Sequence, residues 1–247
     1  MIILKNHCTQ PLRGILFDKD GTLLDLAALW RPAAEQTANE VLQHYCRGDF
    51  SLRKELLFAI GIRGEQLLPE GALVAGTNGD VSLRMQSVLN QHGIATDNDF
   101  VAQTAAFLTR CASGKDSNVW PTCPDLAEVL HTLRQTGIVL GLATSDRPES
   151  AMLHLQKLKI KQEFSFFGTD DGTHRTKPAA DLMNAFCAQT GFSPAECAVV
   201  GDAPNDMRFA ANSGSIGIFL SPNGCTQLPP GAQYSIRSLS ELPSFIQ

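Results

Sequence analysis

The most constraining feature of this sequence is an alternation of short apolar runs with signals for helix starts. The runs span Gly14–Asp18 and residues 138–143, 164–167, 197–201 and 215–220. Continuous apolar runs of this length are typical of strands that are covered on both faces. Between them, Pro124, Pro148 and Pro178 indicate helix starts, and residues 193–196 have the spacing of a capping box. This repetition predicts an α/β fold, a doubly wound parallel sheet with helices on both faces.

The alternation stops between Asp25 and about Trp120. Apolar residues recur there at helical spacing, for example at Leu26, Leu29 and Ala33. We therefore expect residues 25–120 to form an inserted, all-helical domain. Residues 1–24 and 121–247 would form the α/β core domain. The glycine-containing stretch 71–79 predicts a loop within the insertion.

Charge and composition exclude several classes of partner. The 247 residues are 43% hydrophobic and carry a formal net charge of −5 without a dense basic run, so nucleic acid is not an expected partner. No segment is long and apolar enough to span a bilayer, and the apolar start is too short for a signal peptide. The seven cysteines form no C-x-x-C pair, which favours a reduced compartment. We expect a cytoplasmic monomer or homodimer with no membrane partner.

Four groups of polar residues follow predicted strands or begin predicted helices. They are Asp18-Lys19-Asp20-Gly21-Thr22, Thr144-Ser145-Asp146, Lys177, and Asp202 with Asp206. Each group alone would be an ordinary cap or turn. Open α/β sheets, however, bind ligands at the carboxyl ends of their strands, and these groups share that edge. The sequence therefore predicts a single functional site there.

Four carboxylates at one edge need a counter-charge, because like charges so close together cannot all stay ionised. They belong to Asp18, Asp20, Asp202 and Asp206. A hard divalent cation suits such ligands, and Mg²⁺ suits them better than zinc. Together with Lys177 and one protonated carboxyl, the cation would leave the site neutral and able to hold a phosphate ester. One carboxylate would attack phosphorus, and another would protonate the leaving oxygen.

These residues resemble the motifs of the haloacid dehalogenase (HAD) superfamily of phosphohydrolases. Asp18-Lys19-Asp20-Gly21-Thr22-Leu23 is similar to the D-x-D-G-T signature of that family. Thr144 is similar to its second motif, Lys177 to its third, and Asp202 with Asp206 to its fourth. The resemblance implies a Rossmann-like core and a helical cap of the phosphoglycolate phosphatase type, which closes over the site.

The resemblance also implies a role for each residue. Asp18 would be the nucleophile that forms an aspartyl-phosphate, and Asp20 would be the general acid and then the base. Mg²⁺ would be held by Asp18, the backbone carbonyl of Asp20, and Asp202, while Asp206 would orient the water shell of the metal. The transferring phosphoryl group would be bound by Thr144, Ser145 and Lys177.

Asp20 indicates which reaction of the family to expect. Members that dehalogenate carbon lack a carboxylate two residues after the nucleophile, and members that pump ions carry Thr there. We therefore expect a Mg²⁺-dependent phosphatase of a small phosphate monoester, such as phosphoglycolate or a sugar phosphate. Two alternatives stay open: a phosphomutase of sugar phosphates, and a non-catalytic regulatory protein that binds a phosphorylated metabolite.

Residues around the motifs give three further expectations. Asp146 departs from the second motif, and we expect it to cap the next helix. No role is expected for the histidines that lack metal-ligand spacing, which are His44, His92, His131, His154 and His174. At least one cation of the insertion is expected to bind a second anionic group of the substrate, the candidates being Arg31, Arg53, Lys54, Arg63 and Arg84.

Overall fold

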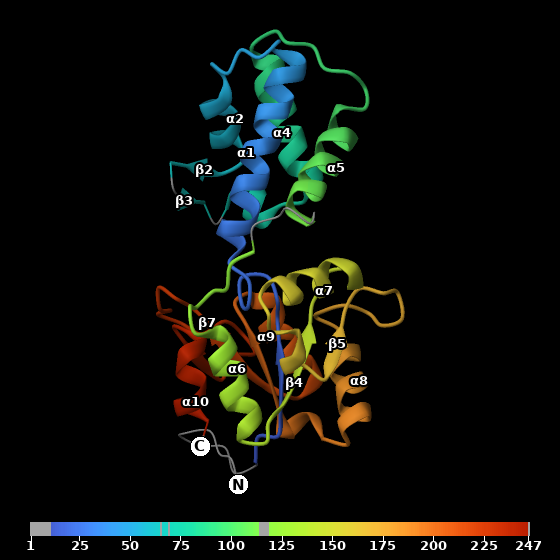
Figure 1. Cartoon of the computed structure of the whole chain (residues 1–247), viewed down its shortest axis with the longest axis vertical. Coiled ribbons are helices and arrows are strands. Elements are labelled where there is room, and N and C mark those ends of the chain that lie inside the picture. Colours follow the sequence, from blue (N-terminus) through green and yellow to red (C-terminus); the bar gives the residue numbers. More distant parts are fainter. Residues whose placement is uncertain (1–10, 65, 69, 114–118, 247) are drawn as a thin grey trace. The chain divides into compact units, whose positions relative to one another are not determined.

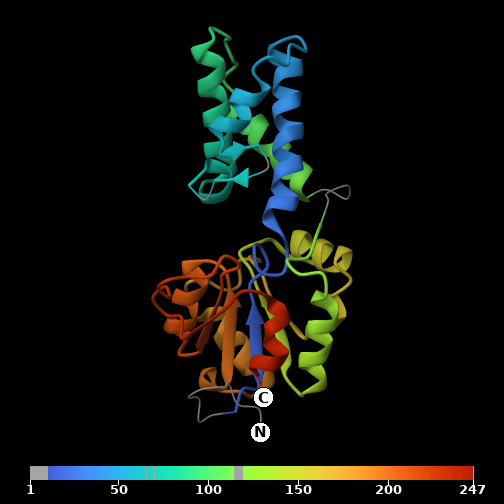
Figure 2. The ribbon, with the colours of Figure 1, turned by 90° about the vertical axis from the view of Figure 1, so that its left-hand side faces the viewer.

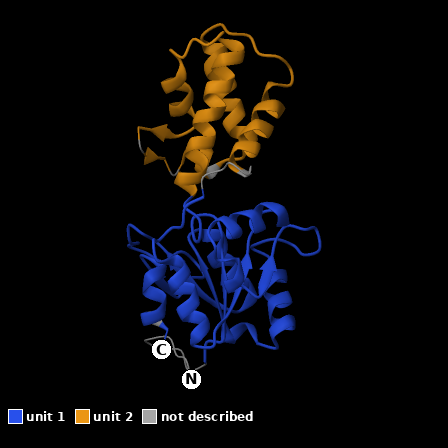
Figure 3. Ribbon diagram, in the orientation of Figure 1, with its two compact units in different colours: residues 1–25, 119–247 blue, residues 26–118 orange. Residues whose placement is uncertain are grey.

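The computed structural model describes residues 11–64, 66–68, 70–113 and 119–246. The chain divides into two compact units, which Figure 3 colours separately. The first, called the core unit below, comprises Met1–Asp25 and Val119–Gln247, and the second, the helical unit, comprises Leu26–Asn118.

The core unit is built on a six-stranded parallel sheet with strand order β5-β4-β1-β6-β7-β8. The strands are β1 (Gly14–Phe17), β4 (Val139–Ala143), β5 (Phe166–Gly168), β6 (Cys197–Gly201), β7 (Ile216–Leu220) and β8 (Tyr234–Ile236). This order confirms the expected doubly wound α/β fold. The last strand was not predicted, because Tyr234-Ser235-Ile236 is too short to form a recognisable apolar run.

Helices cover both faces of the sheet, as Figures 1 and 2 show. Ile15 and Phe17 of β1 pack in one apolar cluster with α6 (Leu126–Gln135), α7 (Pro148–Lys157) and α10 (Leu242–Phe245). Leu16 points to the opposite face and packs with α8 (Asp181–Thr190) and α9 (Pro204–Ser213). Alternate residues of a strand face opposite sides, so a strand that is apolar throughout must be covered on both.

Three helix starts differ from their expected positions. Helix α6 begins at Leu126 rather than at Pro124. Helix α8 begins at Asp181 rather than at Pro178, and the capping box at Ser193 and Glu196 closes only a 3₁₀ turn, Pro194–Glu196. Helix α7 begins at Pro148, as predicted. Proline favours the first turn of a helix without fixing how far that helix extends.

The helical unit contains α1 (Leu26–Tyr45), α2 (Arg53–Ala59), α3 (Ala72–Ala75), α4 (Asn78–Gln91) and α5 (Phe100–Ser113). It is not entirely helical as expected, because Ile62–Arg63 (β2) pairs with Gln66–Leu67 (β3) in a short antiparallel hairpin. The predicted loop at 71–79 is also wrong in part. It contains α3, and α4 begins within it at Asn78, where Thr77 and Asp80 form a capping box.

The six cysteines from Cys46 to Cys225 are all free thiols, and Cys8 lies outside the described residues. Among the helices of the described ranges, none combines the length and the hydropathy that crossing a bilayer requires.

Candidate active site

Three adjacent strands carry the predicted site residues to one edge of the sheet. Strand β1 lies between β4 and β6, with Phe17 opposite both Leu142 and Val200. Asp18 therefore emerges beside the ends of both neighbouring strands. Its backbone N–H donates to the carbonyl oxygen of Val200 at 2.9 Å, which extends the strand pairing up to the site.

An acidic cluster lies at this edge. Asp18, Asp202 and Asp206 each offer a carboxylate oxygen, and these oxygens all lie within 4.8 Å of one another. Thr22 Oγ1 donates to Asp202 Oδ1 at 2.9 Å, and the backbone N–H of Ala203 donates to Asp206 Oδ2 at 3.1 Å. These donors orient the carboxylates of Asp202 and Asp206.

Two glycines make room for this cluster. Gly21 has a φ of +86°, and a β-carbon added there would lie 2.2 Å from Asp202 Oδ2. A β-carbon added at Gly201 would lie 2.3 Å from the β-carbon of Asp206. Both positions need glycine because the carboxylates occupy the space that a side chain would fill.

Lys177 is the buried cation of the acidic cluster. Its Nζ donates to Asp18 Oδ1 and, at 2.6 Å, to Asp206 Oδ1. Burial by itself would lower the pKa of Lys177, but Asp18 and Asp206 outweigh it and raise that pKa above its ordinary value. The lysine is therefore charged, and three carboxylates facing one ammonium leave a formal charge of −2.

The protonation of the carboxylates reflects this excess of negative charge. Burial, and next the charge of Asp18, raises the pKa of Asp202 to about 7 and that of Asp206 to about 6. A divalent cation would neutralise the remaining charge, and oxygen ligands of this kind suit Mg²⁺. The three carboxylates, whose oxygens lie within 4.8 Å of one another, are a donor set that fits such an ion.

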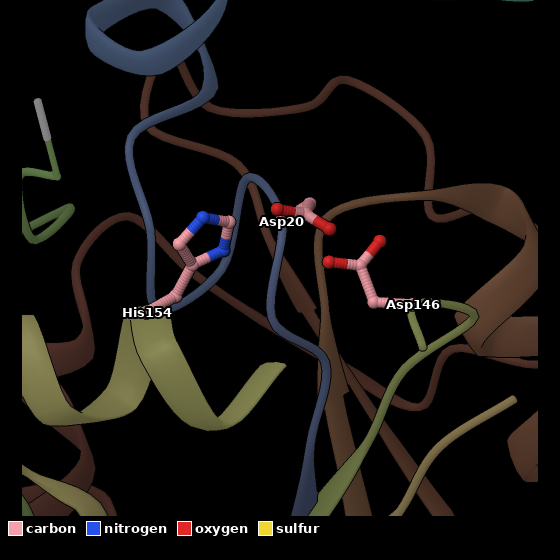
Figure 4. A group of neighbouring side chains, drawn as sticks. All are labelled: Asp20, Asp146 and His154. Carbon is pink, nitrogen blue, oxygen red and sulfur yellow. The ribbon is translucent and has the colours of Figure 1, made fainter. Parts of the chain in front are cut away.

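Asp20 lies outside the acidic cluster, so the four carboxylates expected at this edge of the sheet form two groups. It lies in a second group with Asp146 and His154, whose ligand atoms are within 4.8 Å of one another. Figure 4 shows these side chains converging from the loop after β1, the loop after β4 and helix α7. Lys19 Nζ pairs with Asp20 Oδ1 and lies 3.1 Å from Asp146 Oδ2.

Asp146 does not cap helix α7, so that expectation is wrong. The N-cap residue is Arg147, and it makes no side-chain cap hydrogen bond. Asp146 Oδ2 instead accepts from Ser150 Oγ at 3.0 Å and faces the Lys19 ammonium. The buried cation determines where this carboxylate points.

Thr144 and Ser145 follow β4 at the same edge of the sheet. Thr144 is buried, its N–H donates to the Gly168 carbonyl oxygen at 2.9 Å, and its Oγ1 accepts from the Asp146 N–H at 3.2 Å. Ser145 is exposed. Of the two, only Thr144 is held rigidly by the sheet.

Lys19 and His154 had no predicted role in the site. Lys19 is fully buried, and its Nζ lies 3.2 Å from His154 Nδ1. A lysine between two aspartates at the end of an apolar strand was a usable signal, because a cation flanked by two acids can be buried as a pair. No sequence signal pointed to His154, whose partner is 135 residues away.

Residues 12–214 match the sequence pattern of haloacid dehalogenase-like hydrolases. The chain belongs to this family. The match spans most of the chain, and it includes every residue of the acidic cluster.

Two curated relatives illustrate what this HAD-family chain is similar to. The phosphoglycolate phosphatase of Shigella dysenteriae is 27% identical over 222 residues, which cover 87% of this chain and 84% of that protein. The candidate pyrophosphatase PpaX of Clostridium perfringens is 32% identical over 96 residues, which cover 38% of this chain and 45% of that protein.

Solved structures share the fold. A HAD-superfamily hydrolase from Geobacter sulfurreducens aligns with a TM-score of 0.66 at 16% identity, covering 98% of this chain and 99% of its own. The L-2-haloacid dehalogenase of Xanthobacter autotrophicus aligns with a TM-score of 0.57 at 18% identity, covering 94% and 97%. Because enzymes with different reactions share this fold, the reaction must be argued from the site.

Proposed function

We propose that the protein is a Mg²⁺-dependent phosphatase that hydrolyses a small phosphate monoester through an aspartyl-phosphate on Asp18. The observation that carries this proposal is the buried Asp18 carboxylate, grouped with Asp202 and Asp206 and paired with Lys177. Asp18, Asp202 and the backbone carbonyl of Asp20 would hold the ion, and Asp206 would orient its water shell. When bound, Mg²⁺ supplies positive charge that offsets the charge of the phosphoryl oxygens.

In the first half of the reaction, Lys177, Thr144 and Ser145 bind the phosphoryl group. A carboxylate oxygen of Asp18 attacks phosphorus, and the bond from phosphorus to the ester oxygen breaks. Asp20 gives its proton to that leaving oxygen, so the alcohol departs neutral. Burial, partly offset by Lys19, raises the pKa of Asp20 to about 6, so the protonated fraction of this carboxyl near neutral pH is far larger than that of an ordinary aspartate.

In the second half, Asp20 is a carboxylate and acts as the base. It takes a proton from water, whose oxygen attacks phosphorus and displaces the Asp18 carboxylate. Inorganic phosphate leaves, and both aspartates return to their starting states. The protein mainly orients the reacting groups and neutralises charge, as is general for phosphoryl transfer.

Asp20 also supports phosphate chemistry over dehalogenation. A carbon–halogen bond needs no proton on its leaving group, whereas an alkoxide leaving group does. The phosphoglycolate phosphatase of Shigella dysenteriae, similar over most of its length, supports the same choice. We therefore propose a small phosphorylated metabolite of the phosphoglycolate or sugar phosphate type as substrate.

A cavity within the helical unit supports the expected second anion contact. It has a volume of about 360 Å³ and is lined by Arg31, Arg53, Lys54 and Arg63 together with Glu35. Glu35 pairs with Arg31 at 3.1 Å and with Arg53 at 3.2 Å, so the cations outnumber the acid. We propose that these cations contribute to substrate selection. Lys54→Ala and Arg63→Ala should raise KM, whereas Arg84→Ala, outside this cavity, is the matched control.

The test is a phosphate-release screen over small phosphate monoesters with and without Mg²⁺. Wild-type protein should release phosphate only with the metal, Asp18→Asn should be inactive while remaining folded, and Asp20→Asn should be about a hundredfold slower. Activity retained in Asp18→Asn would contradict the mechanism. Conversion of a sugar phosphate without phosphate release, stimulated by a bisphosphate, would identify a phosphomutase. Binding without turnover would identify a regulatory protein.

A further inference from the structure

We propose that Lys19, held by Asp146 and His154, is a positioning residue that fixes the carboxyl group of Asp20 for proton transfer to the leaving oxygen. This inference rests on the proposed role of Asp20 as the general acid. It concerns three residues outside the nucleophile and the acidic cluster.

The Lys19 ammonium is bound from three directions. Its side chain is only 1% exposed, and Nζ contacts Asp20 Oδ1, Asp146 Oδ2 at 3.1 Å and His154 Nδ1 at 3.2 Å. An ammonium group has three protons to donate, so each contact uses one of them. Nδ1 of His154 accepts in this arrangement, which requires the neutral tautomer with its proton on Nε2.

Two of these contacts anchor the ammonium to the fold. Asp146 lies in the loop after β4, where its carboxylate also accepts from Ser150, and His154 is a buried residue of α7. The third contact reaches Asp20, whose side chain is 30% exposed and follows the end of β1. A fixed cation thus holds a partly exposed carboxyl group.

Asp20, Asp146 and His154 are arranged like the ligands of a metal site, but the cation between them is the ammonium group of Lys19. The ligand atoms of Asp20, Asp146 and His154 lie close enough to share an ion. The Lys19 ammonium already bonds to all three residues. We therefore assign these residues to positioning rather than to a second metal.

The ammonium also distinguishes the two oxygens of Asp20. Oδ1 is bound by Lys19, whereas Oδ2 has no hydrogen-bond partner among the residues that the structure describes. Oδ2 is then the oxygen available to carry the proton that the leaving group receives. Fixing the carboxyl at Oδ1 orients Oδ2 and removes the rotation that would otherwise misplace the acid.

The test compares two substrates in Lys19→Met, which keeps an unbranched side chain one atom shorter and removes its charge. The measured quantity is the pre-steady-state rate at which the phosphoenzyme forms, because Asp20 acts again in the second half. With an alkyl phosphate the rate should fall about tenfold to a hundredfold, with little change in KM. With 4-nitrophenyl phosphate, whose leaving group needs no proton, the rate should change by less than about threefold.

A double variant sharpens the test. If Lys19 acts through Asp20, then Lys19→Met/Asp20→Asn should be no slower than Asp20→Asn with the alkyl phosphate. Asp146→Asn and His154→Gln should also slow phosphoenzyme formation more with the alkyl phosphate than with 4-nitrophenyl phosphate, though by a smaller factor. These two variants replace Lys19→Met in the test if Lys19→Met does not fold. Lys19→Arg should recover part of the alkyl phosphate rate.

Glu163→Gln is the matched control, because this buried carboxylate pairs with Arg134 at 3.2 Å away from the site residues. It should affect both substrates equally. Equal losses with both substrates in Lys19→Met, or losses that multiply in the double variant, would overturn the positioning role. A wild-type enzyme that forms no phosphoenzyme from either ester would instead overturn the proposed function.

Discussion

The effect of Gly21→Ala can be worked out in detail from the structure. A β-carbon at this position would lie 2.2 Å from Asp202 Oδ2, and real β-carbons essentially never come within 3.0 Å of a neighbouring heavy atom. The carboxylate would have to move by about 1 Å, a displacement that is large for a metal ligand. The hydrogen bond from Thr22 to Asp202, 2.9 Å long, would be lost with it.

Gly21→Ala should lower the free energy of unfolding for two reasons. Alanine at a φ of +86° costs about 1–2 kcal/mol in backbone strain. Loss of a hydrogen bond to a charged group adds about 1.5–3 kcal/mol. Gly137→Ala is the matched control, because Gly137 has a φ of +90° and no atom within 4 Å of an added β-carbon. Gly137→Ala should therefore show only the loss of stability that comes from backbone strain.

Thermal unfolding with EDTA and with Mg²⁺ separates these contributions. At about 3 °C per kcal/mol, Gly21→Ala should lower Tm by roughly 10 °C and Gly137→Ala by roughly 5 °C. The rise in Tm on adding Mg²⁺ should disappear in Gly21→Ala and persist in Gly137→Ala. Phosphate release should fall about a hundredfold in the former only. Equal Tm changes and an intact response to Mg²⁺ in both variants would show that Asp202 does not depend on the glycine at position 21.

Two further predictions concern pH and packing. The raised pKa values of Asp202 (about 7) and Asp206 (about 6) mean that, without metal, the folded protein retains protons that the unfolded chain has lost. Stability should therefore fall as pH rises from about 4 to 7, and Mg²⁺ should raise Tm more at pH 8 than at pH 5. An equal Tm rise at both pH values would count against metal binding by these carboxylates. The Phe186 ring fills the space beside Gly14 and Gly141 in the core. Phe186→Ala should therefore lower the free energy of unfolding, measured with urea, by about 3–5 kcal/mol. The exposed Phe50→Ala should cost less than about 1 kcal/mol, and similar costs for both would contradict this packing argument.

The strands that carry the site could be predicted from the sequence because each one is a continuous apolar run. Each apolar run before a predicted site residue is a strand. A strand without polar positions has apolar side chains on both faces, and these are buried only when both faces of the sheet are covered. Strand β8 and the β2–β3 hairpin escaped prediction, since two or three residues give no periodicity.

The division of the carboxylates into two groups could not be predicted from spacing. Asp18 and Asp20 are two residues apart, and in a continuing strand both side chains would face the same way. The chain instead turns at Gly21, and the buried Lys19 ammonium pairs with Asp20. The contacts of that ammonium with Asp146 and His154 join residues more than 100 positions apart, which only the folded structure brings together.

Chemical identification of the phosphorylated residue tests whether Asp18 is the nucleophile. Enzyme mixed with Mg²⁺ and a hydrolysed phosphate monoester is quenched during turnover and treated with borohydride, which reduces an aspartyl-phosphate to homoserine. Peptide mass spectrometry should find homoserine at position 18, and only when metal and substrate are both present. Turnover with an unmodified Asp18, or with the phosphoryl group on another residue, would contradict an aspartyl-phosphate on Asp18.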